Sequence, residues 1–268
     1  MEQRRISFDR VAHVYDETRG HPPEISSQVA DSMVALLPPQ ATILEVGVGT
    51  GRIARPLLKR NLEVFGVDIS IQMMTRFRQL VRPGSPMPYL FQADACQLPF
   101  RSNSFTTVLS VHVFHLIKEW QQALAEMLRV LRPDGYLCTG YDWRDTGSPH
   151  SQINQQWRVI VSKYVENPQH PGPRDFSEVV QVLTNGGAQM KEFEAAVWDY
   201  TFVPADYIQQ IAEGTFSYSW KLDPELMPYC IAELKTWAIK EFGSLEVEFK
   251  LPKKFIWQIF RWEPGTFE

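Results

Sequence analysis

Three acidic residues and a run of glycines mark the positions at which this chain could do chemistry. The stretch LEVGVGTGR, Leu44 to Arg52, follows an apolar segment and places Glu45 two residues before Gly47. Asp68 ends the apolar stretch VFGVD, and Asp94 follows the stretch LFQA. Glycine lets the backbone approach a ligand closely, and the N-terminus of a following helix offers free N–H groups. This pattern predicts a site for a nucleotide-like ligand.

The spacing of the glycines argues against a dinucleotide. Dinucleotide-binding turns carry the pattern GxGxxG. Gly47 and Gly49 match its first two positions, but the third glycine, Gly51, comes one residue early. A carboxylate at Glu45 would also repel a pyrophosphate, so it favours a less negative ligand that has donors to offer. The alternative interpretation is a tight strand-to-helix turn that binds nothing.

The elements that must position these residues alternate along the first half of the chain. Short apolar stretches predict strands and amphipathic stretches predict helices, a pattern typical of a parallel sheet with helices on both faces. The expected strands are 42–46, 62–67, 88–92, 105–111 and 136–140, and the expected helices are 22–39, 50–60, 71–80 and 118–131. Because ligands bind at the carboxyl ends of such strands, we expect Glu45, Asp68 and Asp94 to lie there.

The second half is less regular, with helices expected at 151–166, 175–185, 205–212 and 224–242 and strands at 193–203 and 255–262. The length of 268 residues favours a single domain. Its expected parts are an N-terminal cap (1–40), a cofactor-binding core (41–142) and a substrate-side cap with the last strands (143–268). The predicted fold class is α/β: a Rossmann-like, mostly parallel seven-stranded sheet with helices on both faces, an N-terminal helical cap and C-terminal helical insertions.

Five successive motifs resemble those of a known enzyme family. LEVGVGTGR, VFGVDIS, QADACQLPF, FTTVLSVHVFHLI and LRPDGYLCTG look like the motifs of class I S-adenosylmethionine-dependent methyltransferases. The resemblance covers about residues 8–142 and is strongest to the small-molecule group that includes the ubiquinone/menaquinone C-methyltransferases. It implies an enzyme that moves a methyl group from S-adenosylmethionine to oxygen, nitrogen or carbon of a small organic acceptor by in-line displacement. The identity of the acceptor is left open.

The resemblance also implies a role for individual residues. The methionine part of the cofactor would be held by Glu45 and the backbone of Gly47, Gly49 and Gly51. Asp68 would accept from the ribose hydroxyls, and the adenine would contact Ile69, Met73, Asp94 and Ala95. Ser110 and Val111 would lie beside the methionine moiety, near the methyl group. The segment FDRVAHVYDETRGHPP resembles the family's cap; Tyr15 and Arg19 are its candidate cofactor contacts, with a surface helix as the alternative.

Two histidines after the fourth expected strand are candidate general bases. A neutral imidazole can deprotonate a phenol, an amine or an activated carbon acid. His112 is the candidate catalytic residue, with packing against the sheet as the alternative. His115 alternates with Phe114 and Leu116, so we expect it to pack. No further ligand adjoins the two histidines, and no metal site is predicted.

Composition narrows the class of partner and the compartment. The net charge of −4 argues against DNA, as does the absence of the (Asn/Asp/Ser)-Pro-Pro-aromatic motif of amine methyltransferases from Ser110 to Val113. The three cysteines form no CxxC pair, which favours a reducing, cytoplasmic location. No run of about 18 apolar residues exists, so no membrane association is expected. The oligomeric state is left open.

Aromatic residues of the second half are candidates for contacts with the acceptor. Tyr141, Asp142 and Trp143 follow the fifth expected strand, at the mouth of the expected site. The segment GTFSYSWKLDP, Gly214 to Pro224, predicts either a lid or a structural plug. Two other functions remain open. One is a non-catalytic protein that binds S-adenosylmethionine, because no base is unambiguous. The other is an NAD(P)-dependent oxidoreductase, against which Gly51 and Glu45 argue.

Overall fold

The computed structural model describes residues 6–38, 40–82, 84–166 and 170–262. The chain divides into two compact units. The first consists of Met1–Tyr141, Pro171–Ala196 and Phe255–Glu268, and the second of Asp142–His170 and Val197–Lys254. Parts of the expected substrate-side cap, 171–196 and 255–262, therefore belong to the same unit as the expected cofactor-binding core.

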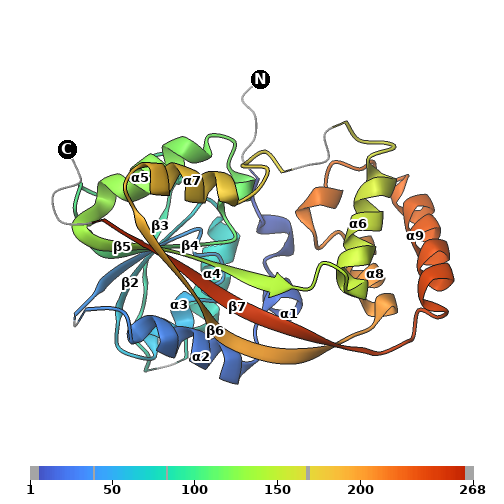
Figure 1. Cartoon of the computed structure of the whole chain (residues 1–268), viewed down its shortest axis with the longest axis horizontal. Coiled ribbons are helices and arrows are strands. Elements are labelled where there is room, and N and C mark those ends of the chain that lie inside the picture. Colours follow the sequence, from blue (N-terminus) through green and yellow to red (C-terminus); the bar gives the residue numbers. More distant parts are fainter. Residues whose placement is uncertain (1–5, 39, 83, 167–169, 263–268) are drawn as a thin grey trace. The chain divides into compact units, whose positions relative to one another are not determined.

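The strands form one seven-stranded sheet in the order β3-β2-β1-β4-β5-β7-β6 (Figure 1). Their bounds are β1 Thr42–Val46, β2 Glu63–Asp68, β3 Tyr89–Gln92, β4 Phe105–Val111, β5 Leu131–Arg144, β6 Gln189–Phe202 and β7 Phe249–Arg261. The pairs β1–β2, β1–β4, β2–β3 and β4–β5 are parallel. The predicted mostly parallel α/β fold is confirmed. The connection after β1 leads to β2 on one side, whereas β4 lies on the other side of β1. The carboxyl ends of β1 and β4 therefore border the crevice where open α/β sheets bind ligands.

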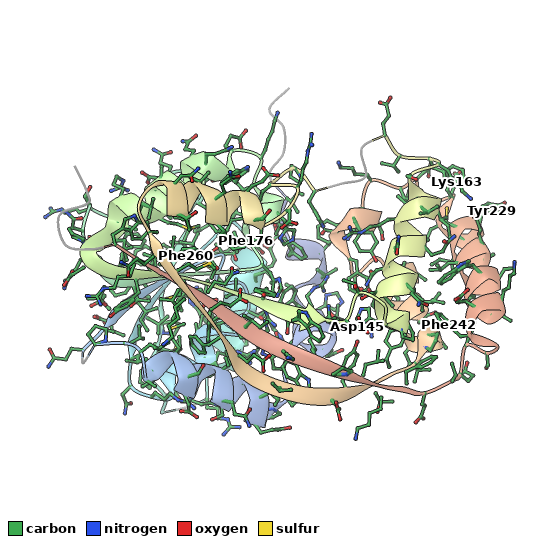
Figure 2. All side chains as sticks on the ribbon, viewed as in Figure 1. Asp145, Lys163, Phe176, Tyr229, Phe242 and Phe260 are labelled. Carbon is green, nitrogen blue, oxygen red and sulfur yellow. The ribbon has the colours of Figure 1, made fainter. Side chains whose placement is uncertain are left out.

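Helices of the first unit cover both faces of the sheet. They are η1 Asp9–Val11, α1 Tyr15–Arg19, α2 Pro23–Val34, α3 Ala54–Leu58, α4 Ile71–Leu80, η2 Phe114–Leu116, α5 Trp120–Val130 and α7 Ser177–Asn185. Figure 1 shows α5 and α7 on one face and α2 and α3 on the other. On the α5 face, one buried cluster joins strand residues such as Val108 and Phe260 to Met127 and Val179; Figure 2 labels Phe260 within it. On the opposite face, the Trp257 indole N–H donates to the Val29 carbonyl of α2, at 3.3 Å.

The helix expected at 50–60 is much shorter than predicted. Its regular part is α3, Ala54–Leu58. Gly49 and Gly51 have φ values of +54° and +77°, so the backbone is left-handed and a helix cannot begin before Gly51 has passed. Asn61, with φ +58°, stands just beyond the other end of the helix. The glycine turn therefore takes residues that the apolar pattern had assigned to the helix.

The second unit contains α6 Pro149–Val161, α8 Pro204–Ala212, η3 Ser217–Ser219 and α9 Met227–Phe242. The aromatic segment Gly214 to Pro224 packs into this unit's own core. The Trp157 indole N–H donates to Ser219 Oγ at 3.0 Å, and the Trp220 indole N–H donates to the Gly214 carbonyl at 2.7 Å. These contacts favour the structural plug over the lid. None of the helices in the described part of the chain is long and apolar enough to cross a membrane.

Candidate functional site

The turn after β1 places glycine backbone, which has no side chains, at the edge of the sheet. Gly47 has φ +75°, and a Cβ there would lie 2.2 Å from Val113 Cγ2. Both the backbone angle and the neighbouring side chain therefore require glycine at this position. The Val67 carbonyl accepts from the Gly47 N–H at 2.7 Å and holds the turn against β2.

A cavity of about 110 Å³ lies at the carboxyl ends of the first strands. Most of the residues predicted to bind a cofactor line it: Tyr15, Gly47, Gly49, Asp68, Ile69, Met73, Asp94, Ala95 and Val111. His112 lines it as well. The structure thus brings together residues that are up to about a hundred positions apart in the sequence. Glu45, Gly51, Ser110 and Arg19 are absent from the lining of this cavity.

Asp68 is the acid with the most organised surroundings. Its Oδ2 accepts from the Gly49 N–H and its Oδ1 from the Ser70 N–H, each at 2.8 Å. Burial raises the pKa of this carboxyl, while the two backbone donors act in the opposite direction. Each carboxylate oxygen has a second lone pair, so both oxygens can still accept from a ligand's hydroxyl groups.

Asp94 is fixed by its own backbone. Its Oδ1 accepts from the Cys96 N–H at 2.9 Å, and its carbonyl accepts from the Gln97 N–H at 2.9 Å. This turn holds the carboxylate at the cavity wall, next to Ala95. An acceptor at this position suits a ligand that presents an amino group.

Glu45 lies behind the cavity rather than in its wall. The side chain is 3% exposed, and its Oε2 has no hydrogen-bond partner among the described residues. Burial raises the pKa of the carboxyl to about 8, against the opposing charge of Arg52. Glu45 is therefore largely protonated at neutral pH, and a cation placed near it would draw the proton off.

The predicted residues Gly51 and Arg19 have contacts with the protein itself. A Cβ on Gly51 would lie 2.5 Å from the Phe77 ring, so this glycine makes room for α4. The Arg19 guanidinium lies 5.0 Å from the Tyr15 ring centroid and 5.7 Å from that of Phe8. Tyr15 and Phe8 both line the cavity, so Arg19 contacts two residues of its wall.

The N-terminal segment closes one side of the cavity and is fastened to neighbouring helices. Asp9 Oδ1 accepts from the Ser70 hydroxyl, at the start of α4. Asp16 forms an ion pair with Arg55 of α3. Ile6 and Phe8, which the sequence analysis did not identify, contribute apolar surface to the lining. Phe8 begins the stretch that resembles a cap, whereas Ile6 lies two residues before it.

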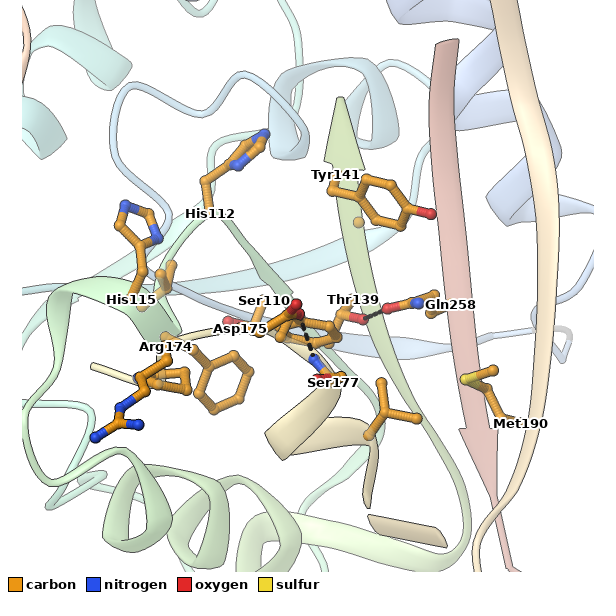
Figure 3. Close-up of a pocket in the computed structure, with 16 residues that line it drawn as sticks. Ser110, His112, His115, Thr139, Tyr141, Arg174, Asp175, Ser177, Met190 and Gln258 are labelled. Carbon is orange, nitrogen blue, oxygen red and sulfur yellow. Dashed lines mark hydrogen bonds between the residues drawn. The ribbon is translucent and has the colours of Figure 1, made fainter. Parts of the chain in front are cut away.

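A second cavity, of about 580 Å³, adjoins the first (Figure 3). His112 and Val113 line both cavities. His112 has φ +58°, a left-handed backbone that is uncommon outside glycine and that recurs at functional sites. Ser110 lines this cavity instead of the first, as does Tyr141. His115, which we expected to pack, is half-buried and also lines it.

The rest of this second cavity comes from elements that sequence reasoning did not connect to the site. Its other lining residues include Phe114, Thr139, Arg174, Asp175, Phe176, Ser177, Val180, Met190 and Gln258. They belong to η2, β5, β6, β7, α7 and the loop before α7. Asp142 and Trp143, predicted to lie at the mouth of the site, belong to the second unit, where Asp142 pairs with Lys253 at 3.3 Å. Within the described residues, no group of three or more His, Cys, Asp or Glu is placed to hold a metal.

Comparison with known proteins identifies the part of the chain that carries the motifs. Residues 44–139 match the family described as "Methyltransferase domain". The chain is 37% identical over 95 residues to phosphatidylethanolamine N-methyltransferase of Cereibacter sphaeroides, covering 35% of this chain and 46% of that protein. It is 29% identical over 171 residues to demethylmenaquinone methyltransferase of Renibacterium salmoninarum, covering 62% and 70% of the two chains. The chain spans about half the length of several curated relatives that it matches.

A solved structure supports the same fold. The YcgJ protein of Bacillus subtilis superposes with a TM-score of 0.59 at 18% identity, covering 88% of this chain and 98% of that one. At this identity the likeness concerns the fold alone. The family match confirms the predicted resemblance to methyltransferases over residues 44–139.

Proposed function

We propose that this chain, which carries a methyltransferase domain of the S-adenosylmethionine-dependent class, transfers a methyl group to a small organic acceptor. The observation that carries the proposal is the pair of adjoining cavities that share His112 and Val113. One is lined by the motif residues, and the other is large enough for a small molecule. Relatives named for demethylmenaquinone and for 2-methyl-6-phytyl-1,4-hydroquinone support an organic acceptor.

The acidic residues around the smaller cavity suit this cofactor. When bound, S-adenosylmethionine supplies a methyl group that its sulfonium has already activated. Asp68 is proposed to accept from the ribose hydroxyls and Asp94 from the adenine amino group, while Ile69 and Met73 flank the ring. Glu45, with its unpartnered Oε2, is proposed to face the cationic methionine end across the glycine turn. Gly51 and Arg19 are proposed to act indirectly. Gly51 leaves room for the Phe77 ring, and Arg19 packs against the Tyr15 ring and holds it in place.

Cofactor entry is proposed to require movement of the N-terminal segment. Ligand pockets commonly enclose about 300–1,000 Å³, whereas this cavity encloses about 110 Å³. Ile6, Phe8 and Tyr15 line it from the N-terminal segment, which side-chain contacts of Asp9 and Asp16 fasten to α4 and α3. A displaced segment would open the cavity, and its return would exclude water from the reaction.

His112 is proposed as the general base. It stands at the boundary of the two cavities, where an acceptor's nucleophile would meet the methyl group. A base here would take the proton that the nucleophile loses as its bond to the methyl carbon forms. Ser110 and Val111, the last two residues of β4, are proposed to hold the two reactants in line.

The narrower points of partner and place are proposals as well. The acceptor is proposed to be a small molecule rather than DNA, in keeping with the net charge of −4. A cytoplasmic location is proposed because Cys96, Cys138 and Cys230 are all free thiols. Residues 41–142 are proposed as the cofactor-binding core, 1–40 as its cap and 143–268 as a substrate-side cap with the last strands.

Calorimetric titration tests the cofactor first. S-adenosylhomocysteine should bind to the whole chain and NAD should not; the reverse result would overturn the proposal in favour of an oxidoreductase. Transfer of a labelled methyl group from S-adenosylmethionine to a fractionated metabolite extract then tests catalysis. Binding with no labelled product from any extract would leave a non-catalytic binding protein as the better description.

A further inference from the structure

A row of polar side chains crosses the floor of the larger cavity. In the sheet register, Val46 of β1 pairs with Ser110 of β4, and Ser110 pairs with Thr139 of β5. Paired residues on neighbouring parallel strands point to the same face. The Thr139 hydroxyl lies 3.2 Å from Gln258 Oε1 of β7. Ser110, Thr139 and Gln258, which we call the polar floor, therefore extend from the edge of the cofactor cavity across three strands (Figure 3).

The orientation of the polar floor is set from its far end. Gln258 Nε2 donates to Glu192 Oε2 at 2.8 Å, which turns Oε1 of the same amide toward Thr139. The Thr139 hydroxyl then donates its proton to Gln258. A hydroxyl whose single O–H already donates a hydrogen bond can only accept further hydrogen bonds. Thr139 consequently presents a lone pair, rather than a proton, to the cavity, and Gln258 Oε1 keeps a second lone pair beside it.

Ser110 is the member of the polar floor with a bond still to make. Its side chain is 2% exposed, and its Oγ has no hydrogen-bond partner among the described residues. A buried hydroxyl without a partner costs free energy that a bound ligand can recover. Ser110 lines the larger cavity, next to the shared residue His112.

The remaining walls favour a neutral and apolar occupant. Phe114 is buried, and Phe176 and Val180 pack against the same apolar cluster. The charged residues among the lining are Arg174 and Asp175, for the part of the chain that the structure describes. Asp175 Oδ1 accepts from the Ser177 N–H at the start of α7, and Figure 3 shows Arg174 directed away from the polar floor. The lone pairs of Thr139 Oγ1 and Gln258 Oε1 therefore suit a donor group of the ligand better than an anionic one.

We propose that the larger cavity binds a neutral, flat acceptor through one hydroxyl or N–H group, which donates to the polar floor, while Phe114 and Phe176 contact the ring. Ser110, Thr139 and Gln258 are then the residues that select the acceptor. This inference rests on the proposed function for the identity of the neighbouring ligand. The volume of about 580 Å³ accommodates a substituted bicyclic aromatic.

Four naphthalene probes of one size test the inference by calorimetry on the whole chain saturated with S-adenosylhomocysteine. They are 2-naphthol, 2-methoxynaphthalene, 2-naphthoate and 2-naphthylmethylamine. We expect 2-naphthol to bind about tenfold more tightly than 2-methoxynaphthalene, the effect of one or two neutral hydrogen bonds. Equal binding of these two probes, or tighter binding of the naphthoate anion or the ammonium form of the amine, would overturn the proposal.

Three near-isosteric variants separate the polar floor from the bulk of the cavity. Thr139→Val, Gln258→Leu and Ser110→Ala should each reduce the preference for 2-naphthol by about two- to tenfold and leave the affinity for 2-methoxynaphthalene within about twofold. Thr107→Val is the matched control, because Thr107 is a buried hydroxyl of the same β4 strand on the opposite face. A loss of preference in the control equal to that in the floor variants would refute the assignment.

Titration of S-adenosylhomocysteine into the unaltered chain and the same variants distinguishes a failure of the proposed function from a failure of the polar floor. Absence of cofactor binding in the unaltered chain would refute the proposed function. Normal cofactor binding with no preference for the donor-bearing probe would refute the polar floor alone.

Discussion

Replacing Glu45 by glutamine should stabilise the free protein in a pH-dependent way. The carboxyl is 3% exposed, and burial raises its pKa from 4.5 to about 8. In the unfolded chain the group ionises near pH 4.5. Because the folded pKa is the higher one, the stability that neutral Glu45 allows is fully present below pH 4.5 and is lost as the pH rises toward 8. Glutamine cannot ionise and loses nothing over this window.

The size of the effect follows from the two pKa values. Each pH unit between them costs about 1.4 kcal/mol. At pH 7, Glu45→Gln should therefore be more stable than the unaltered protein by about 3 kcal/mol, with the difference levelling off near 5 kcal/mol above pH 8. At pH 4, where both side chains are neutral, the two proteins should agree to about 1 kcal/mol.

Urea unfolding between pH 4 and pH 9, without cofactor, measures this difference. Glu63→Gln, an exposed position on the neighbouring strand β2, serves as the control and should give a difference that is small at every pH. A stability difference for Glu45→Gln that does not change with pH, or a variant that is less stable at pH 7, would refute the reasoning. The same variant should bind S-adenosylhomocysteine more weakly, since a neutral amide attracts the ligand's ammonium less than a carboxylate does.

Three further substitutions test separate parts of the structure. Asp68→Asn should weaken S-adenosylhomocysteine binding by about 1–3 kcal/mol in calorimetry, the range for a hydrogen bond to a charged group; unchanged affinity would mean that the ribose is held elsewhere. His112→Asn keeps a residue type that tolerates φ +58°, and it should lower the methyl-transfer rate by about 10²–10⁴ while cofactor affinity stays within about threefold. Equal losses in both would contradict a role as base. Burial lowers the pKa of His150 to about 3. The stability that neutral His150 contributes is therefore fully present above pH 6.5 and is lost as the pH falls toward 3. In urea unfolding, the stability of His150→Phe relative to the unaltered protein should rise by about 3 kcal/mol between pH 7 and pH 4, and parallel curves would exclude this.

Elements with a strong local signal were predicted with their observed bounds. The strands Thr42–Val46 and Phe105–Val111 and the helix Ile71–Leu80 agree with the structure. Each is a short run whose own apolar pattern and flanking residues set its ends. The positions of Asp68 and Asp94 in the wall of one cavity followed from the same patterns, because parallel strands end at a common edge of the sheet.

The glycine turn shows where a local pattern misled. The predicted helix begins at Thr50, yet α3 begins only at Ala54. Gly49 and Gly51 have left-handed backbones, and a Cβ on them would lie 3.2 Å from Met73 and 2.5 Å from Phe77 of a different helix, α4. Sequence alone gives no measure of that packing.

The amino-acid sequence by itself determined the family resemblance, the acids at the strand ends and the glycine turn, since each depends on neighbours within a few residues. Only the tertiary structure decided that Gln258 lies 3.2 Å from Thr139, 119 residues away, and that Glu192 orients it. These contacts exist because β7 enters the sheet between β5 and β6, an order that no local pattern encodes. The larger cavity, and with it the proposed choice of acceptor, therefore comes from the sheet order, because side chains from distant strands meet only once the sheet has formed.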